Sequence, residues 1–180
     1  MTAAIHPKVE AIATADDGEI PNNPRYPLLY YKSAVASPNE EIDAGTILGR
    51  FAANGWGGGW IDGIYDFHHY HARAHEVLAN AGDPVTVQFG GRQGPVVTFS
   101  PGDVVIIPAG VGHCRLDDPK RLVIVGAYPP GQESWDLKRI GAADYARGKL
   151  EVPLVARPRR DPVTGQAGPL LDYWSTEPRS

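Results

Sequence analysis

Between residues 61 and 128 the chain is a series of short apolar runs separated by residues that favour tight turns. The runs are four or five residues long, which is the usual length of a strand and too short for an amphipathic helix. Turn residues such as Gly90-Gly91 stand between them. The runs are Val85–Phe89, Val96–Phe99, Val104–Ile107 and Leu122–Val125. Short strands at this spacing predict an all-β sandwich or barrel.

Composition agrees with one globular domain and excludes several classes of protein. The chain has 180 residues, 42% of them hydrophobic and 21% charged, which is ordinary for a domain with a sizeable core. Its 21 glycines and 17 prolines favour frequent turns over long helices. The formal net charge is −4 without a block of Lys and Arg, so nucleic acid is not an expected partner. Cys114 is the single cysteine, which excludes a disulfide within the chain.

Neither a secretory signal nor a membrane span is expected from the sequence. Residues 1–24 lack the apolar centre of a signal peptide. Nowhere does the sequence approach the roughly 18 consecutive apolar residues of a membrane helix. We therefore expect a cytoplasmic protein without membrane partners.

The two ends of the chain differ from the strand-rich middle. Residues 1–24 show no hydrophobic periodicity and are expected to form a loosely held N-terminal arm. Residues 25–150 should form the barrel. Residues 151–180 are rich in Pro, Gly and Arg, but we expect this tail to pack on the barrel because it also carries Leu170, Leu171, Tyr173 and Trp174.

One longer helix is predicted over about residues 38–53, where apolar residues recur at helical spacing. Ser37 is the expected N-cap, and Asn54-Gly55 should end the helix. A strand over residues 27–33 should precede it, and the glycine-rich residues 56–60 should follow as a loop.

Histidines at two places in the chain predict a metal site. On a strand, side chains alternate between faces, so His69 and His71 should point the same way about 7 Å apart. Glu76 follows a short stretch that can turn the chain and return a carboxylate to the same cavity. A bend at Pro108–Gly110 can turn His113 inward after a buried run. Three imidazoles and a carboxylate suit a divalent transition metal.

Neighbouring residues of similar chemistry have simpler explanations. His68 should point away from the site, and His75 should face away from Glu76 on an extended backbone, so structural or solvated roles are expected for both. Cys114 follows His113 and is expected to be structural rather than a ligand.

The histidine region resembles the first motif of the cupin superfamily. Gly63 is followed by five residues, then His69-Tyr70-His71, then four residues and Glu76, as in the family pattern. The glycine after the acid comes one residue early, at Gly82. A count of three residues after the second histidine would make His75 the third ligand, whereas the family's set of three histidines and one glutamate favours Glu76.

The second motif of the family is matched by Gly102, Pro108, Gly110 and His113, with Asp117 where the pattern has Asn. Together the motifs imply a single-domain cupin β-barrel, a double-stranded β-helix or jelly roll with a few short peripheral helices. They imply that the metal ligands are His69, His71, Glu76 and His113. The resemblance also suggests a homodimer.

The similarity is closer to the YjlB-type bacterial cupins, over roughly residues 25 to 175. The segments that carry it are Asn54-Gly55-Trp56, Trp60, Gly63-Ile64-Tyr65, Phe67–Leu78, Pro108–His113, Gly126–Pro129, Asp161-Pro162 and Gly168–Leu170. This resemblance adds to the expected fold and leaves the reaction open.

A site with this ligand set takes one divalent ion per chain, namely Fe, Mn, Ni, Zn or Cu. With four protein ligands, an octahedral ion keeps two positions for water, O₂ or a substrate. We therefore expect a metal-dependent oxygenase or isomerase that acts on a small oxygenated molecule. The alternative is a non-catalytic cupin that senses or stores a small molecule or the metal.

Four aromatic residues flank the predicted site in the sequence, and packing in the core or at the rim of the site is expected for all of them: Trp56, Trp60, Tyr65 and Tyr70. Arg73 pairs with a substrate carboxylate if it faces the mouth of the site, and is otherwise a surface charge.

Overall fold

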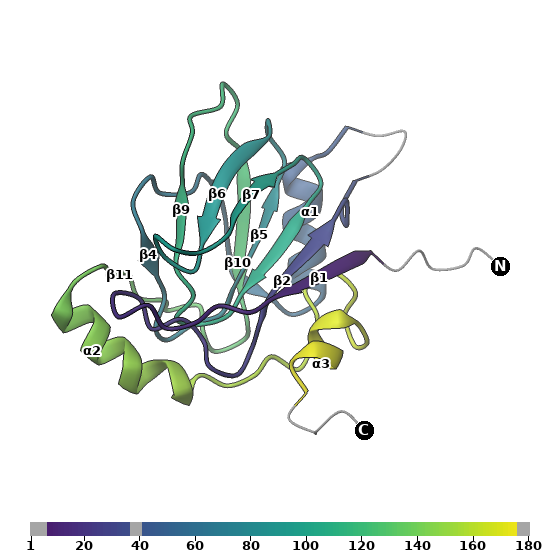
Figure 1. Ribbon diagram of the computed structural model, residues 1–180. Coiled ribbons are helices and arrows are strands. Elements are labelled where there is room, and N and C mark those ends of the chain that lie inside the picture. Colours follow the sequence, from purple (N-terminus) through teal and green to yellow (C-terminus); the bar gives the residue numbers. More distant parts are fainter. Residues whose placement is uncertain (1–6, 37–40, 176–180) are drawn as a thin grey trace.

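The computed structural model describes residues 7–36 and 41–175 and consists mainly of β-strands (Figure 1). The strands form two antiparallel sheets packed face to face, and the helices are short and peripheral. The predicted all-β class is confirmed. Among the helices of the described residues, none has the length and apolar character that a membrane-spanning helix requires.

The larger sheet contains six strands in the order β1-β2-β8-β5-β10-β3. Its strands are β1 (Lys8–Ile12), β2 (Leu28–Lys32), β3 (Gly57–Asp62), β5 (Glu76–Asn80), β8 (Val104–Ile107) and β10 (Ile124–Tyr128). Every residue of β5, β8 and β10 is buried, so both faces of the centre of this sheet are covered. Such strands have to be apolar at successive positions rather than at alternate ones.

The smaller sheet contains five strands in the order β11-β4-β9-β6-β7. Its strands are β4 (His69–Tyr70), β6 (Val85–Phe89), β7 (Val96–Phe99), β9 (His113–Arg115) and β11 (Lys138–Arg139). Strand β6 alternates buried and half-buried residues, which is the pattern of a strand with one face on the core. The core between the sheets joins Leu78 and Val105 of the larger sheet to Val87 and Phe89 of the smaller one.

The outer face of the larger sheet is covered by helix α1 (Ala44–Ala53) and by the C-terminal segment (Figure 1). Helix α1 contributes Ile47 and Phe51, both buried. Short helix α3 (Pro169–Tyr173) contributes Leu170, which is fully buried in the same cluster. These two elements explain why β5 and β10 are buried on both faces.

Trp174 anchors the C-terminal segment in this core. It is fully buried, and its ring stacks on Tyr26 with centroids 4.9 Å apart. Its Nε1 donates a hydrogen bond to the carbonyl oxygen of Pro27 at 2.8 Å. Because an indole N–H needs a partner when buried, this bond fixes the ring as well as satisfying it.

The remaining helices lie beside the smaller sheet. Helix α2 (Ala142–Glu151) continues into the 3-10 helix η1 (Val152–Leu154), and Val152 packs in a small cluster with Ile20 and Tyr70. The hydroxyl of Tyr70 donates to the carbonyl oxygen of Asp144 at 2.7 Å. Strand β4 is thereby attached to α2.

Three strands have the predicted bounds, and a fourth is displaced. Strands β6, β7 and β8 coincide with the apolar runs. The run predicted at Leu122–Val125 becomes β10, which begins at Ile124 and extends to Tyr128. Pairing with β3 on one side and β5 on the other carries this strand past the apolar run.

Helix α1 begins later than predicted. Residues 41–43 are not helical, and the N-cap is Asp43, whose Oδ2 accepts the backbone N–H of Thr46 at 2.6 Å. The expected start at residue 38 and the N-cap at Ser37 lie outside the described residues. The predicted end is confirmed, because Asn54 is the C-cap and Gly55 has a positive φ of 85°.

The glycine-rich segment at residues 56–60 is not the loop that its composition predicts. Residues 57–62 form β3, an edge strand of the larger sheet that pairs with β10. Trp60 lies opposite Gly126, and a Cβ at that glycine would come within 2.1 Å of the Trp60 ring. The glycine therefore allows the indole to lie against the neighbouring strand.

The described part of the N-terminal segment, from residue 7 onward, is held by the fold, which differs from the expectation of a loosely held arm. Strand β1 pairs with β2, the strand predicted at residues 27–33. Asn22 is buried, and its Nδ2 donates to the carbonyl oxygens of Ala15 and Gly90. Hydrogen bonds from amide side chains hold this segment against distant loops, and hydrophobic periodicity cannot predict such bonds.

We expect Trp174→Ala to lower the free energy of unfolding by about 3 to 5 kcal/mol, because it empties a buried site and removes an indole hydrogen bond. Chemical denaturation monitored by circular dichroism measures the change. Leu154→Ala, at a side chain that is 82% exposed, should change it by no more than about 0.5 kcal/mol. Similar effects of the two substitutions would contradict the packing of the C-terminal segment.

Candidate metal centre

Backbone pairing brings three of the predicted ligands together. In the smaller sheet β4 is antiparallel to β9, with His69 directly opposite His113. Opposed residues project from the same face, and the two imidazole centroids are 4.0 Å apart. His71 follows two residues after His69 and returns to that face. The three buried histidines offer ligand atoms that all lie within 4.8 Å of one another, a group that could hold a metal ion.

The second ring nitrogen of each histidine fixes its orientation. Nδ1 of His69 contacts the carbonyl oxygen of Phe67 at 3.1 Å, and Nδ1 of His113 contacts that of Val111 at 3.3 Å. Nδ1 of His71 contacts the carbonyl oxygen of Asp136. Since a carbonyl oxygen only accepts, each Nδ1 must carry a hydrogen, and in the neutral ring this leaves Nε2 with a free lone pair. Metal-binding histidines are held in this way.

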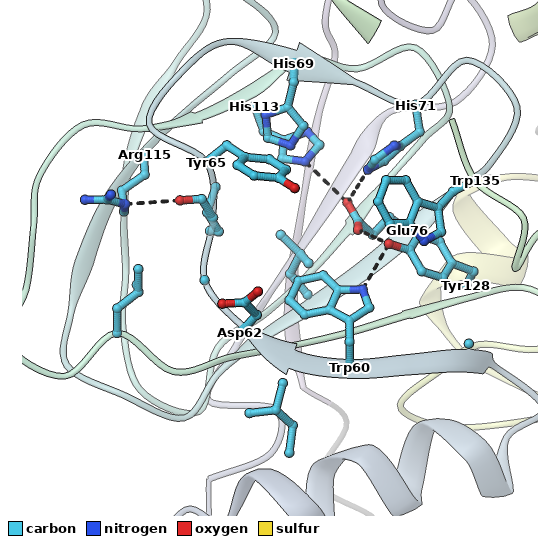
Figure 2. Close-up of a pocket in the computed structure, with 16 residues that line it drawn as sticks. Trp60, Asp62, Tyr65, His69, His71, Glu76, His113, Arg115, Tyr128 and Trp135 are labelled. Atoms are coloured by element: carbon cyan, nitrogen blue, oxygen red, sulfur yellow. Dashed lines mark hydrogen bonds and ion pairs between the residues drawn. The ribbon is translucent and has the colours of Figure 1, made fainter. Parts of the chain in front are cut away.

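Glu76 reaches the cluster from the other sheet. It is the first residue of β5, and its Oε2 lies 3.3 Å from Nε2 of both His71 and His113. Its Oε1 accepts a hydrogen bond from the hydroxyl of Tyr128 at 2.9 Å, and that hydroxyl accepts one from Nε1 of Trp60 at 2.9 Å (Figure 2). The chain of donors fixes one oxygen of Glu76 and turns the other toward the imidazoles.

Burial and neighbouring charges shift the pKa values of the clustered groups in different directions. Burial, with a smaller contribution from the nearby His113, lowers the pKa of His69 to about 2. Burial alone would raise the pKa of Glu76, but His71 and His113 outweigh it and the net pKa is below the ordinary value. Burial opposes protonation of His71, yet Glu76 raises its pKa overall. His69 is thus neutral and available as a ligand.

The cluster opens into a pocket of about 600 Å³ (Figure 2). This volume is in the range of small-molecule sites. Strands β3, β5, β9 and β10 supply most of the wall, together with the segment after β3. The lining residues are Gly58, Trp60, Ile61, Asp62, Gly63, Ile64, Tyr65, His69, His71, Glu76, Leu78, His113, Arg115, Leu122, Tyr128 and Trp135.

Comparison with known proteins places the chain in a family. It is 36% identical to YjlB of Bacillus subtilis (strain 168), described as an uncharacterized protein, over 159 residues that cover 88% of this chain and 92% of YjlB. The chain belongs to the YjlB family. The predicted resemblance to YjlB-type proteins is therefore confirmed. No protein-family model matches the chain.

Solved structures similar to this member of the YjlB family include three proteins at low sequence identity. A cupin 2 domain-containing protein from Halorhodospira halophila is 16% identical, with 89% of this chain and 88% of that chain covered and a TM-score of 0.34. RmlC from Streptococcus suis is 14% identical, with 71% and 72% covered and a TM-score of 0.37. Acireductone dioxygenase from Bacillus anthracis is 15% identical, with 58% and 79% covered and a TM-score of 0.39.

His75 lies outside the histidine cluster, although it is adjacent to Glu76. It is fully buried on the opposite side of the strand, where its ring centroid is 4.9 Å from that of Trp174. Its Nδ1 accepts the backbone N–H of Ala109 at 2.9 Å. Burial lowers the pKa of His75 to about 3, so it remains a neutral core residue. The alternation along the chain thus gives Glu76, and not His75, to the pocket.

His68 and Cys114 also lie outside the cluster. His68 is half-buried, and burial together with the charge of Arg92 lowers its pKa. Cys114 is buried, and its Sγ lies 3.4 Å from the carbonyl oxygen of Arg115. Their neighbours on β4 and β9 face the pocket, as alternation along a strand requires.

The flanking residues divide between core and pocket. Trp56 is buried in the core, with its Nε1 donating to the carbonyl oxygen of Arg160 at 3.1 Å, and Tyr70 packs against α2. Trp60 and Tyr65 lie in the wall of the pocket. Arg73 is 59% exposed and lies 3.9 Å from Asp136 outside the pocket, so it is a surface charge.

Among the polar and aromatic side chains of the pocket wall, sequence reasoning missed four: Asp62, Arg115, Tyr128 and Trp135. The position of Tyr128 could have been predicted. It shares a face of β10 with Ile124 and Gly126, and its hydroxyl is the one polar side-chain group on that face. Trp135 comes from an irregular segment, where no periodicity predicts the direction of a side chain. Its ring stacks on Tyr128 with centroids 5.9 Å apart.

In the metal-free protein, Glu76→Gln should lower the free energy of unfolding most between pH 4.5 and pH 6.5, the ordinary pKa values of Glu and His. The folded pKa of Glu76 is lowered, so its contribution is present above pH 4.5 and is lost as the pH falls. The folded pKa of His71 is raised, so its contribution is present below pH 6.5 and is lost as the pH rises through the raised value.

Urea denaturation of wild type and variant across this pH range measures the difference. Glu133→Gln, at an exposed position, serves as the control. The difference in unfolding free energy between this variant and wild type should show no maximum in that pH range. A difference between wild type and Glu76→Gln that is the same at every pH would contradict the buried pair.

Proposed function

We propose that this protein holds one divalent transition metal ion with His69, His71, His113 and Glu76, and uses it to convert a small oxygenated molecule bound in the adjoining pocket. The observation that carries the proposal is the convergence of three buried, backbone-oriented imidazoles on the wall of that pocket.

The buried groups of the cluster lack a partner that a bound cation would provide. Oε2 of Glu76 is buried and, among the described residues, makes no hydrogen bond of normal geometry, although two imidazoles lie 3.3 Å away. Burying a carboxylate beside three imidazoles costs free energy unless the charge is compensated. A divalent cation supplies the missing partner for this oxygen and for the three Nε2 lone pairs.

The donor set narrows the choice of metal. Imidazole and carboxylate ligands suit Fe, Mn, Ni, Zn and Cu in the divalent state. Cys114 lies outside the cluster, so no thiolate favours a soft ion such as Cu(I). When bound, an ion of this kind polarises oxygen groups of a substrate or activates O₂, which supports isomerase or oxygenase chemistry.

The protein's own residues orient the site. Tyr128 and Trp60 hold Oε1 of Glu76, which leaves Oε2 directed at the cluster. The backbone of Asp136 holds His71, while the ring of Trp135 stands edge-on to that imidazole at 5.2 Å between centroids. A substrate in the pocket therefore meets fixed ligands on one side, with the aromatic rings of Tyr128 and Trp135 beside them.

Catalysis is favoured over storage because the cluster is accessible from a pocket rather than closed on all sides. A structural or storage site fills its coordination sphere with protein groups, whereas a catalytic site leaves part of it to solvent and substrate. Here His69, His71, Glu76 and His113 all belong to the pocket wall.

Replacing His113 with Ala should abolish stable metal binding, because one of three converging imidazoles is lost. We expect close to one metal per chain in the wild type and little in the variant, by elemental analysis after dialysis. The rise in melting temperature on metal addition should disappear as well, since metal binding adds to folding free energy. His68→Ala, outside the cluster, should keep both properties. Equal metal content in wild type and His113→Ala would refute the site.

The same proteins test catalysis. Wild type loaded in turn with Fe²⁺, Mn²⁺ and Ni²⁺ is incubated with diketones, thiols and keto-sugars, and product formation and O₂ uptake are followed. Turnover of one class by wild type and His68→Ala, but not by His113→Ala, is the expected result. Full metal occupancy without turnover in every form would favour a binding protein instead.

Tyr128→Phe should weaken metal binding about 10- to 100-fold, the usual effect of losing a group that orients a ligand. The substitution removes the donor to Glu76 and the acceptor of Trp60 Nε1. Competition with a chromophoric chelator measures the affinity. Tyr30→Phe is the matched control, because Tyr30 also donates from a buried hydroxyl to a buried carboxylate, that of Asp103. Tyr30→Phe should lower the free energy of unfolding but leave the metal affinity unchanged. A metal affinity of Tyr128→Phe equal to that of wild type would contradict the role of Tyr128.

A further inference from the structure

We propose that the pocket selects a neutral or cationic small molecule with an apolar, ring-sized body, and that Asp62 is the residue that selects its charge. The inference rests on the proposed function, because it places the oxygen groups of that molecule at the metal centre and its remaining body along the pocket.

The walls of the pocket supply mostly apolar and aromatic surface. Ile64 and Leu78 form its inner part and belong to the core between the sheets. Tyr65 is 48% exposed, Ile61 is 49% exposed and Trp135 is 40% exposed, although all three line the same cavity. Binding a ligand that covers large apolar side chains around a cavity is favourable, because it removes their surface from water. An apolar body of ring size provides that cover.

The pocket offers no free cation to an anionic group. Apart from histidine, Arg115 is the single basic side chain among the described residues that line it. Its Nε donates to the carbonyl oxygen of Ile64 at 3.1 Å, and its Nη1 donates to the carbonyl oxygen of Asp117 at 2.5 Å and to Oδ1 of Asp118 at 2.8 Å. Figure 2 shows the guanidinium turned away from the histidines. A phosphate or a second carboxylate on the substrate would therefore remain unpaired.

Asp62 adds a negative charge on the opposite side of the cavity. It is the last residue of β3, is exposed, and makes no ion pair with another described residue among the salt bridges of the structure. Its carboxylate points into the pocket between Tyr65 and Trp60, across from the histidines (Figure 2). A molecule that binds the metal at one end presents its other end to this carboxylate, which attracts a cation and repels an anion.

Three probes with the same metal-binding head and different tails test this selection. Each carries two adjacent phenolic oxygens on one ring: 4-methylcatechol has a neutral tail, dopamine a cationic tail and 3,4-dihydroxyphenylacetate an anionic tail. They are titrated by calorimetry into the full chain loaded with Zn²⁺, which does not oxidise them. Zinc content is measured first.

Dopamine should bind most tightly, and the anionic probe should bind roughly fivefold more weakly than 4-methylcatechol, as expected for one partly exposed charge. Asp62→Asn should remove most of the difference among the three probes while leaving the affinity for 4-methylcatechol and the zinc content unchanged. Asp66→Asn removes the same charge from a nearby exposed position that does not line the pocket, and should preserve the wild-type order.

The outcomes separate this inference from the proposed function. A chain that takes up no Zn²⁺ overturns the proposed function and the inference with it. A zinc-loaded chain that binds the anionic probe as tightly as the neutral one, or that binds none of the three, overturns the inference alone. The same order of affinities in wild type and Asp62→Asn overturns the role of Asp62.

Discussion

The antiparallel pairing of β4 with β9 is the constraint on which the candidate metal centre depends. It sets His69 opposite His113, two residues far apart in the chain, and leaves their rings 4.0 Å apart between centroids. His71 joins them because side chains alternate along an extended backbone. Backbone carbonyls then orient all three rings, so the direction of each imidazole is set by the strands and loops around it.

The fourth group of the site comes from the other sheet, which makes the centre a junction between the two layers. Glu76 begins β5, and the residue that holds it, Tyr128, ends β10 beside it in the larger sheet. These two strands are covered on their outer face by α1 and by the segment that contains Trp174. The packing of the C-terminal segment therefore supports the strands that position the carboxylate, even though Trp174 does not touch the pocket.

Sequence patterns predicted the parts of the fold that follow local rules. Strands β6, β7 and β8 were predicted from apolar runs between turn residues, and the end of α1 from Asn54-Gly55. The glycine-rich strand β3 was missed because glycine disfavours strands, whereas here Gly126 on the neighbouring strand makes room for Trp60. Strand β1 was missed because its alternation of polar and apolar residues is short and its residues are exposed or half-buried, so that pairing with β2 places it.

What the sequence by itself determined is the chemistry: three histidines and a glutamate with the spacing of two motifs, and short strands to carry them. Only the tertiary structure decided which residues surround that chemistry. The sequence gives the same expectation for Trp56 and Trp60, yet Trp56 is buried in the core and Trp60 lines the pocket. Alternation fixes which residues share a face of one strand, but which face meets a cavity depends on strands paired across the whole chain.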